Sequence, residues 1–331
     1  NHGTVNGATW SDDVPITTPS SWSQQVINDN AINVENHISA DLDGDGHLDI
    51  LVGLYEQDQL VWHKNLGDGT FGEALIIASG DEVNMVYALD ASDIDNDGDL
   101  DVFAANLWSS VPFIGWYENT DGTGTFGSRV NISNDQSLSY VRTVKAVDLD
   151  LDGDLDILGN QSADPSLFWY ENLGDATFGA EIFMAGLDIG VHTVAPADMD
   201  GDGDLDVVAG GAVPNTGGQQ GRVYWVENMD ATFDNQHLVA SRVVFDLQVD
   251  DLDGDGDMDI VTAEKLDNDT QFIGIHENLD GLGTFGDEQV ISTDLVDPRR
   301  VFASDLDADG DKDILSTSYT DGKLAWYENL G

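Results

Sequence analysis

The stretch DIDNDGDLDVFAANLW, residues 93–108, places five aspartates within nine residues and then turns apolar without a break. Carboxylates this close together repel one another, so such a loop destabilises the chain unless a cation lies among them. The chain carries the motif six times, and successive copies begin 50 to 55 residues apart. A repeat of this length indicates an architecture built from similar structural units. The six copies begin at Asp41, Asp93, Asp148, Asp198, Asp251 and Asp305.

A second motif follows each acidic loop, and FWYENLGDATFG (residues 168–179) is a clear copy of it. Within one unit, apolar stretches lie before and after the acidic loop, and a last one follows the Gly-rich turn. The enrichment in β-branched and aromatic residues favours strands, and no sustained helical period is present. Six four-stranded units predict an all-β fold, a six-bladed β-propeller whose radial closure leaves few free sheet edges.

The two ends of the chain predict how the propeller closes. SSWSQQVIND (residues 20–29) aligns with GTFGDEQVIST (residues 283–293), and the chain stops at WYENLG, where another such strand is due. We therefore expect a strand around Gln25–Ile27 to complete the last blade. The predicted organisation is an N-terminal extension, residues 1–20, followed by one propeller domain, residues 21–331.

The spacing within the acidic loop is typical of a calcium site. Calcium takes roughly six to eight oxygen ligands, whereas magnesium prefers fewer protein ligands and more water. We expect side-chain ligands from positions 1, 3, 5 and 9, a backbone carbonyl from position 7, and a bend at the glycine in position 6. The start resembles an EF-hand loop, but the last acid comes at position 9 and a strand follows, which argues against an EF-hand.

Calcium in all six loops is therefore the expected cofactor, and solvated acidic turns are the weaker alternative. The predicted ligands are Asp41, Asp43, Asp45, His47 and Asp49; Asp93, Asp95, Asp97, Asp99 and Asp101; Asp148, Asp150, Asp152, Asp154 and Asp156; Asp198, Asp200, Asp202, Asp204 and Asp206; Asp251, Asp253, Asp255, Asp257 and Asp259; Asp305, Asp307, Asp309, Asp311 and Asp313.

Composition excludes several classes of partner. Eleven Lys and Arg against 64 Asp and Glu give a net charge of −53, which repels nucleic acids and anionic membranes. No apolar run is long enough to insert into a membrane, and without cysteine the chain has no disulfides or thiolate metal sites. The chain begins with Asn1 rather than Met, so we expect a processed product from which an export signal has been removed.

The Asp-x-Asp-x-Asp-Gly-Asp-x-Asp loops, followed by apolar strands and separated by WYEN and GTFG motifs, resemble FG-GAP/VCBS repeats. These repeats form integrin-α-type β-propellers, and the chain is especially similar to secreted bacterial versions and calcium-bearing fungal lectin propellers. The resemblance covers roughly residues 21–331. It implies secretion or a cell-surface location, calcium between the first and second strands of each blade, and a role in cell adhesion or glycan binding.

Ligand-binding residues are expected where the units differ, because the tryptophan that recurs in the WYEN motif is better explained by packing between blades. The connection between second and third strands lengthens at residues 106–113, which include Trp108, and at 210–222 and 264–272. The residue six positions before each acidic loop also varies, and arginines concentrate near it, which predicts a basic ring near the axial channel. Structural ion pairs are the equal alternative. The varying residues are Glu35, Tyr87, Arg142, His192, Phe245 and Arg299, with Arg242 and Arg300 nearby.

Three functions fit these features. The first is a non-catalytic adhesin or lectin that binds an anionic glycan or an extracellular protein partner. The second is a polysaccharide lyase in which Tyr87 or Tyr140 and His192 act as acid and base while Arg142 neutralises a uronate. The third is a subunit of a surface layer or filament that self-assembles through calcium. No nucleophile or zinc motif stands out, so binding is favoured over catalysis.

Overall fold

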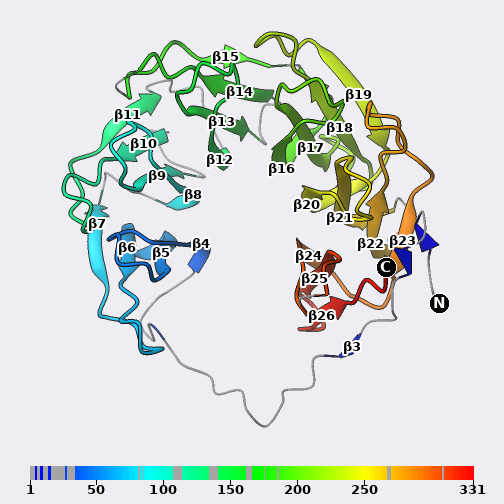
Figure 1. Cartoon of the computed structure of the whole chain (residues 1–331), viewed down its shortest axis with the longest axis horizontal. Helices are drawn as coiled ribbons and strands as arrows, with labels where there is room; N and C mark the ends of the chain where they lie inside the picture. Colours follow the sequence, from blue (N-terminus) through cyan, green and yellow to red (C-terminus); the bar gives the residue numbers. More distant parts are fainter. Residues whose placement is uncertain are drawn as a thin grey trace. The chain divides into compact units, whose positions relative to one another are not determined.

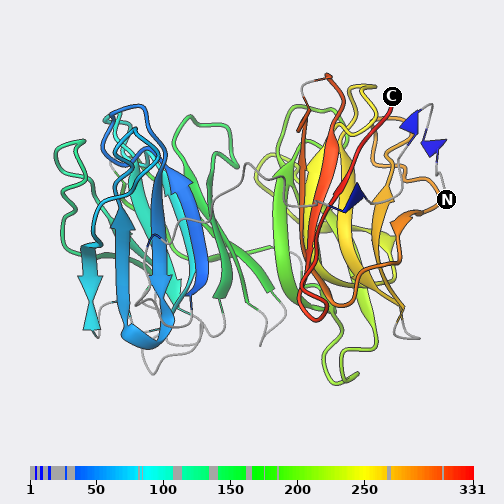
Figure 2. The same ribbon diagram turned by 90° about the horizontal axis from the view of Figure 1, so that it is seen from below.

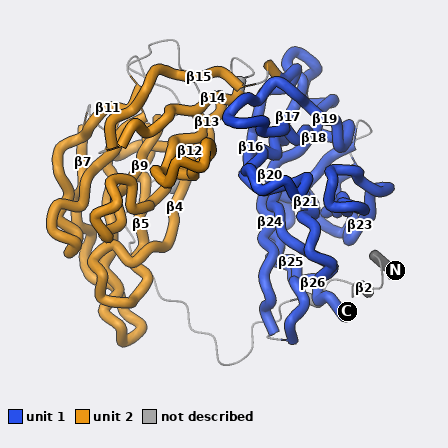
Figure 3. Tube along the Cα trace, turned by 45° about the horizontal axis from the view of Figure 1, so that its top comes forward, with its two compact units in different colours: residues 1–22, 187–331 blue, residues 23–186 orange. Residues whose placement is uncertain are grey.

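The computed structural model describes residues 1–331 except 1–3, 6–7, 10–13, 16–26, 28–33, 81–82, 84, 107–113, 134–140, 162–165, 175, 185, 267–269 and 308. The chain divides into two compact units (Figure 3). Unit 1 comprises Asn1–Trp22 and Leu187–Gly331, and unit 2 comprises Ser23–Gly186. Each unit is described separately below.

Unit 2 contains three antiparallel four-stranded sheets (Figure 1). The strands of each sheet follow one another in sequence order, as expected for repeated units joined by short turns. Sheet 1 is β4 (Val34–Ala40), β5 (Asp49–Leu54), β6 (Gln59–His63) and β7 (Leu75–Ser79); sheet 2 is β8 (Val86–Ser92), β9 (Asp101–Asn106), β10 (Ile114–Tyr117) and β11 (Val130–Ser133); sheet 3 is β12 (Val141–Val147), β13 (Asp156–Gln161), β14 (Ser166–Tyr170) and β15 (Ile182–Phe183).

Unit 1 contains three further sheets of the same kind and a two-stranded ribbon, β1 (Thr4–Val5) with β2 (Ala8–Thr9). Among the described residues the only helix is a single 3₁₀ turn, η1 (Tyr55–Gln57), in unit 2. The predicted all-β chain of six four-stranded units is therefore confirmed. Sheet 4 is β16 (Gly190–Ala197), β17 (Asp206–Ala212), β18 (Gly221–Glu227) and β19 (Asn235–Ala240); sheet 5 is β20 (Val243–Asp250), β21 (Asp259–Lys265), β22 (Gln271–His276) and β23 (Gln289–Ser292); sheet 6 is β24 (Pro298–Ser304), β25 (Asp313–Ser318), β26 (Leu324–Tyr327) and β3 (Val14–Pro15).

An N-terminal strand completes sheet 6, but it is not the predicted one. β3 pairs with β26 through Val14 opposite Trp326 and Pro15 opposite Ala325. Gln25 lies outside the described residues, and Ile27 lies in an exposed bend. An edge strand tolerates Pro15 because its outward side needs no backbone donor. Two residues of the predicted N-terminal extension thus belong to sheet 6.

The apolar core of each unit lies between consecutive sheets. One cluster joins sheets 1 and 2 around Leu51, Trp62 and Tyr117, and another joins sheets 5 and 6 around Ile273 and Tyr327. The second strand of a sheet is covered on both faces: every residue of β9 is buried. This double burial explains why second strands read as continuous apolar runs rather than as an alternating pattern.

The recurring tryptophans of the third strands pack as the sequence predicts. Trp62, Trp116 and Trp225 belong to the clusters between sheets, and Trp169 is buried as well. Trp326, near the C-terminal end, is half-buried. The four buried side chains pack in the core and are not available to stack on a ligand.

A buried aspartate fastens each acidic loop to the third strand of the same sheet. In sheet 3 the Asp156 carboxylate accepts hydrogen bonds from the backbone N–H of Leu149, within the loop, and of Asn172, after β14, at 2.9 and 2.8 Å. Asn172 in turn donates its side-chain amide to the carbonyls of Ile94 in the preceding loop and of Leu155, both at 3.1 Å. Loop, sheet and neighbouring sheet are thereby joined through a single Asp–Asn pair.

The same pair recurs in the other sheets. Asn119 donates to the carbonyl of Leu42, Asn278 to that of Met199 and Asn329 to that of Leu252, in each case across to the preceding acidic loop. These links hold sheet 1 to sheet 2 in unit 2, and sheets 4, 5 and 6 together in unit 1. The invariance of the asparagine in all six copies is the sequence signal for this role.

We expect Asn172→Ala to lower the free energy of unfolding by about 1–3 kcal/mol, because it leaves the buried carbonyls of Ile94 and Leu155 without a donor. Chemical denaturation monitored by tryptophan fluorescence would measure this loss. The matched control is Asn131→Ala, an exposed asparagine on β11. Equal effects of the two substitutions would contradict the structural role of Asn172.

Candidate metal centres and ligand-binding residues

The acidic loops lie between the first and second strands of the sheets, at one end of each sheet, and the chain runs back through the second strand (Figure 2). Backbone N–H groups hold the turn in shape. In the second loop, Asp93 accepts from the N–H of Asp97 and of Gly98, both at 3.0 Å, and Asp97 accepts from that of Asp99 at 3.0 Å. Gly98 has a φ of 99°, which a side chain would strain. The loop therefore curls around its own carboxylates.

This curl brings carboxylates from alternate positions together. In the first three loops, one oxygen from each aspartate at positions 1, 3 and 5 lies within 4.8 Å of the other two, and in the fourth loop the position 9 aspartate joins those at positions 1 and 3. The structure thus brings together carboxylates that the spacing singled out. The sets in the first four loops include Asp41, Asp43 and Asp45; Asp93, Asp95 and Asp97; Asp148, Asp150 and Asp152; Asp198, Asp200 and Asp206.

The position 7 side chain lies apart from this set. A Cβ on Gly122, in the turn after β10, would lie 2.3 Å from Asp99 Oδ1, so the Asp99 carboxylate packs against that turn. Gly122 also has a φ of 62°, so the site requires glycine for two reasons. The position 7 carbonyl as a ligand stays a prediction.

The position 9 aspartates are the most buried acids of the loops. Asp101, Asp156, Asp206 and Asp259 are at most 1% exposed, and desolvation raises the pKa of each to about 7. Two backbone N–H donors act in the opposite direction on Asp156 and favour its charged form. A bound cation would remove the remaining cost of burying this charge.

The glutamate of the WYEN motif acts on the charges of the acidic loop, which the sequence did not predict. Burial, with like charges from Asp97 and Glu118, raises the pKa of Asp95. Asp150 is raised in the same way by burial and by its acidic neighbours, which include Glu171. The glutamate of this motif therefore adds negative charge beside the position 3 aspartate. It recurs in five of the six sequence repeats, and this recurrence is the sequence signal for its role.

The donor set fits a hard divalent cation. All side chains assembled in the second to fourth loops are carboxylates, which calcium prefers. In the third loop Asp148 Oδ1 is buried, and no donor among the described residues reaches it. A buried carboxylate oxygen without a donor is costly, and a cation would satisfy it.

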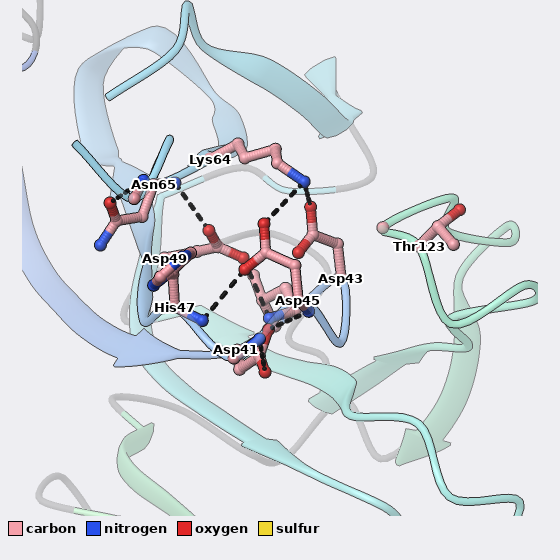
Figure 4. Close-up of polar contacts among 12 residues, drawn as sticks. Asp41, Asp43, Asp45, His47, Asp49, Lys64, Asn65 and Thr123 are labelled. Atoms are coloured by element: carbon pink, nitrogen blue, oxygen red, sulfur yellow. Dashed lines mark hydrogen bonds and ion pairs between the residues drawn. The ribbon is translucent and has the colours of Figure 1, made fainter. Parts of the chain in front are cut away.

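The first loop differs from the others (Figure 4). Position 7 is His47, and Lys64 stands where the other units have glutamate. The Lys64 ammonium forms ion pairs with Asp43 and with Asp45, the latter at 3.0 Å (Figure 4). Hydrogen bonds that the ammonium donates to these carboxylates, to Asp43 first, raise the pKa of Lys64 above its ordinary value. This loop already contains a positive charge.

The six varying residues that lie six positions before the acidic loops share an unforeseen feature: each is the extra residue of a β-bulge in the first strand of its sheet. The ladder between first and second strands skips one residue at this point in all six sheets, close to the end opposite the acidic loop. A bulge frees a residue from the ladder and redirects its side chain. The six bulge residues are Glu35, Tyr87, Arg142, His192, Phe245 and Arg299.

Bulge residues of adjacent sheets contact one another within each unit. In unit 2 the Arg142 guanidinium lies over the Tyr87 ring, 5.9 Å from its centroid. In unit 1 the Arg299 guanidinium lies 5.0 Å from the centroid of Phe245, and His192 Nδ1 lies 2.9 Å from the carbonyl oxygen of Val244. Trp108 and Tyr140 lie outside the described residues.

The arginines of this region divide into two groups. Arg242 pairs with Glu288 at 2.6 Å, Arg299 with Asp297 at 2.9 Å, and Arg300 lies 3.6 Å from Asp246. For these three the ion-pair interpretation describes the structure. Arg142 forms no ion pair with a described residue, and its buried Nε has no acceptor among them.

The sheets and acidic loops define a protein built from repeats of the kind that form β-propeller blades. The FG-GAP-like repeat model matches residues 41–104, 93–159, 148–209 and 251–316. Because these matches cover more than half of the chain, the protein belongs to the FG-GAP-like repeat family. A comparison with curated proteins finds no significant match.

A solved structure shares this fold. The chain is similar to an Agrocybe aegerita lectin described as recognising non-reducing terminal N-acetylglucosamine, with a TM-score of 0.59 and 21% sequence identity. The match covers 90% of this chain and 80% of the lectin. No helix among the described residues is long and apolar enough to cross a membrane.

The raised pKa of Asp156 predicts how the calcium-free protein responds to pH. The carboxyl is protonated more readily in the folded state, with a pKa of about 7, than in the unfolded chain, where the ordinary value is 3.8. Its contribution to stability is thus complete below pH 3.8 and is lost as the pH rises toward 7, at no more than about 1.4 kcal/mol per pH unit.

In the presence of a chelator, the free energy of unfolding of the wild type should fall as the pH rises from 3.8 to about 7. We expect a smaller fall for Asp156→Asn, because asparagine does not titrate. Denaturant titrations at several pH values would measure the slope. The control is Asp121→Asn, because hydrogen bonds, first from the Thr123 hydroxyl, lower the pKa of the exposed Asp121. Identical slopes for wild type and Asp156→Asn would show that Asp156 does not titrate in this range.

Proposed function

We propose that this protein is a non-catalytic, calcium-stabilised glycan-binding module in which Arg142 and Tyr87 contact the glycan. The observation that carries the proposal is the Arg142 side chain, which a bulge frees from the ladder and which lies over an aromatic ring without a carboxylate partner among the described residues. In a chain of net charge −53, such a guanidinium is an unusual feature. It would bind a carboxylate or sulfate by paired N–H donors.

The Tyr87 ring complements this charge. Aromatic faces are suited to the apolar faces of sugars, and a bulge places Tyr87 next to Arg142 from the adjacent sheet. The glycan-binding function described for the Agrocybe aegerita lectin supports the choice of ligand class. An acidic glycan, such as one with uronate residues, fits the pair better than a neutral one.

Calcium in the acidic loops is the second part of the proposal. The aspartates at positions 1, 3, 5 and 9 would hold the ion, which supplies positive charge to carboxylates that otherwise repel one another. The proposal includes a secreted or cell-surface location, because calcium modules outside the cell need bind the ion only at about 10⁻⁴–10⁻³ M. The proposal also includes closure of the six sheets into one ring, which the pairing of β3 with β26 supports.

Removal of calcium tests this part directly. Because calcium binds the folded state, each site at a free calcium concentration 100 times its Kd should add about 2.7 kcal/mol of stability. We expect EGTA to lower the melting temperature strongly in calorimetry, and calcium but not magnesium at equal concentration to restore it. An unchanged melting temperature would reject the assignment of calcium.

A glycan array with and without chelator tests the ligand. We expect binding to uronate-bearing or sulfated glycans, at least tenfold weaker for Arg142→Ala and for Tyr87→Ala, which corresponds to about 1.4 kcal/mol. The control is Arg129→Ala, which removes an arginine just before the last strand of sheet 2. Equal weakening by the control would point to overall charge rather than to a site.

The same experiments also test the two alternative functions, catalysis and self-assembly. Turnover of a bound uronate glycan, seen as ultraviolet absorbance of an unsaturated product, would replace the binding proposal with the lyase. Growth of particle size on adding calcium would favour a self-assembling subunit. His192, the other residue of the lyase hypothesis, belongs to unit 1, whereas Tyr87 and Arg142 belong to unit 2.

A further inference from the structure

We infer that the Lys64 ammonium occupies the place of the metal in the first acidic loop, so that the protein binds five calcium ions and not six. This inference rests on the proposed binding of calcium by the other loops. Lys64 follows β6, at the position that glutamate takes in the remaining five units. Its ammonium is in ion-pair contact with Asp43 and Asp45, two of the three aspartates that converge in this loop.

The net charges of the six loops support a lysine ammonium, and not calcium, in the first loop. Four aspartates and one lysine give the first loop and its facing residue a charge of −3, with His47 neutral. Five aspartates and one glutamate give each of the second to fifth loops a charge of −6, and Lys312 brings the sixth to −5. The first loop therefore attracts a divalent cation much less, and a calcium ion would have to displace an ammonium that lies beside its ligands.

Burial makes this displacement unfavourable. The Asp43 side chain is only 4% exposed, so separating it from Lys64 without compensation leaves a buried charge. One oxygen of Asp43, Oδ1, is buried and has no donor among the described residues, so a single ammonium compensates the loop only in part.

The first loop keeps the backbone arrangement of the others. Asp41 accepts from the N–H of Asp45 and Gly46 at 3.1 and 2.9 Å, and Asp45 accepts from that of His47 at 3.0 Å. Asp49 accepts from Leu42 and Asn65 at 3.0 and 2.7 Å. The turn thus has the same shape with a lysine inside it, and sheet 1 does not need calcium to hold its loop.

The sixth loop shows that a lysine nearby is not sufficient. Lys312 lies within that loop, at position 8, but its ammonium pairs with Asp250 at 3.0 Å, outside the loop. The direction of the Lys64 side chain, and not the presence of a lysine, sets the first loop apart. Lys312 therefore provides a matched control.

The experiment is a count of bound calcium on the full chain by native mass spectrometry after exchange into calcium-containing buffer. We expect five ions in the wild type, six in Lys64→Glu, four in Glu118→Lys and five in Lys312→Met. Six ions in the wild type, or no gain in Lys64→Glu, would overturn the inference while leaving the calcium proposal intact. No bound calcium in any variant would overturn the calcium proposal itself.

A second measurement does not depend on the folding of Lys64→Glu. In EGTA, we expect Lys64→Met to lower the melting temperature by about 2 °C or more, because it removes the only cation of the first loop while keeping the aliphatic chain. Glu118→Met should not lower it, because it removes a like charge from the second loop. Equal shifts for the two substitutions would show that Lys64 does not compensate the first loop.

Discussion

The structure depends on one interaction, the buried aspartate that accepts two backbone N–H groups at the end of every acidic loop. Asp156, for example, joins the loop to the third strand of its sheet, and Asn172 extends the connection to the preceding loop. The position must be an acid, because two converging donors favour a charged acceptor. It must also be buried, because it lies where strand, loop and neighbouring sheet meet. The remaining aspartates of the loop lie around this buried carboxylate.

That arrangement concentrates negative charge, and the chain resolves the problem in two ways. In the second loop the acids, with Glu118 nearby, form a cluster suited to a hard cation, and the calcium proposed there would couple metal binding to folding. In the first loop the chain supplies its own cation through Lys64, so that sheet is independent of calcium. One backbone shape thus accommodates two charge compositions, which differ in a single facing residue and in His47.

The sequence predicts the strands, the repeat and the acidic loops well because each depends on local spacing. It could not reveal that Lys64 reaches Asp43, because that contact joins residues 21 positions apart and depends on the direction of one side chain. It also placed the N-terminal strand at Gln25–Ile27 instead of Val14–Pro15, because alignment favours similar motifs and an edge strand needs only a short pairing. Nor could the sequence reveal the acidic partners of the arginines, because Arg242, Arg299 and Arg300 form ion pairs that no sequence pattern indicates.

The bulges affect how a chain built from repeats can evolve. Outside the ladder, a residue such as Tyr87 or Phe245 can be exchanged without disturbing the hydrogen bonds that hold its sheet. Gene duplication copies the whole unit, whereas later substitutions accumulate most freely at the one position that carries little of the stability. Six copies therefore provide six positions for trial, and new specificities can evolve in the protein while its scaffold stays constant.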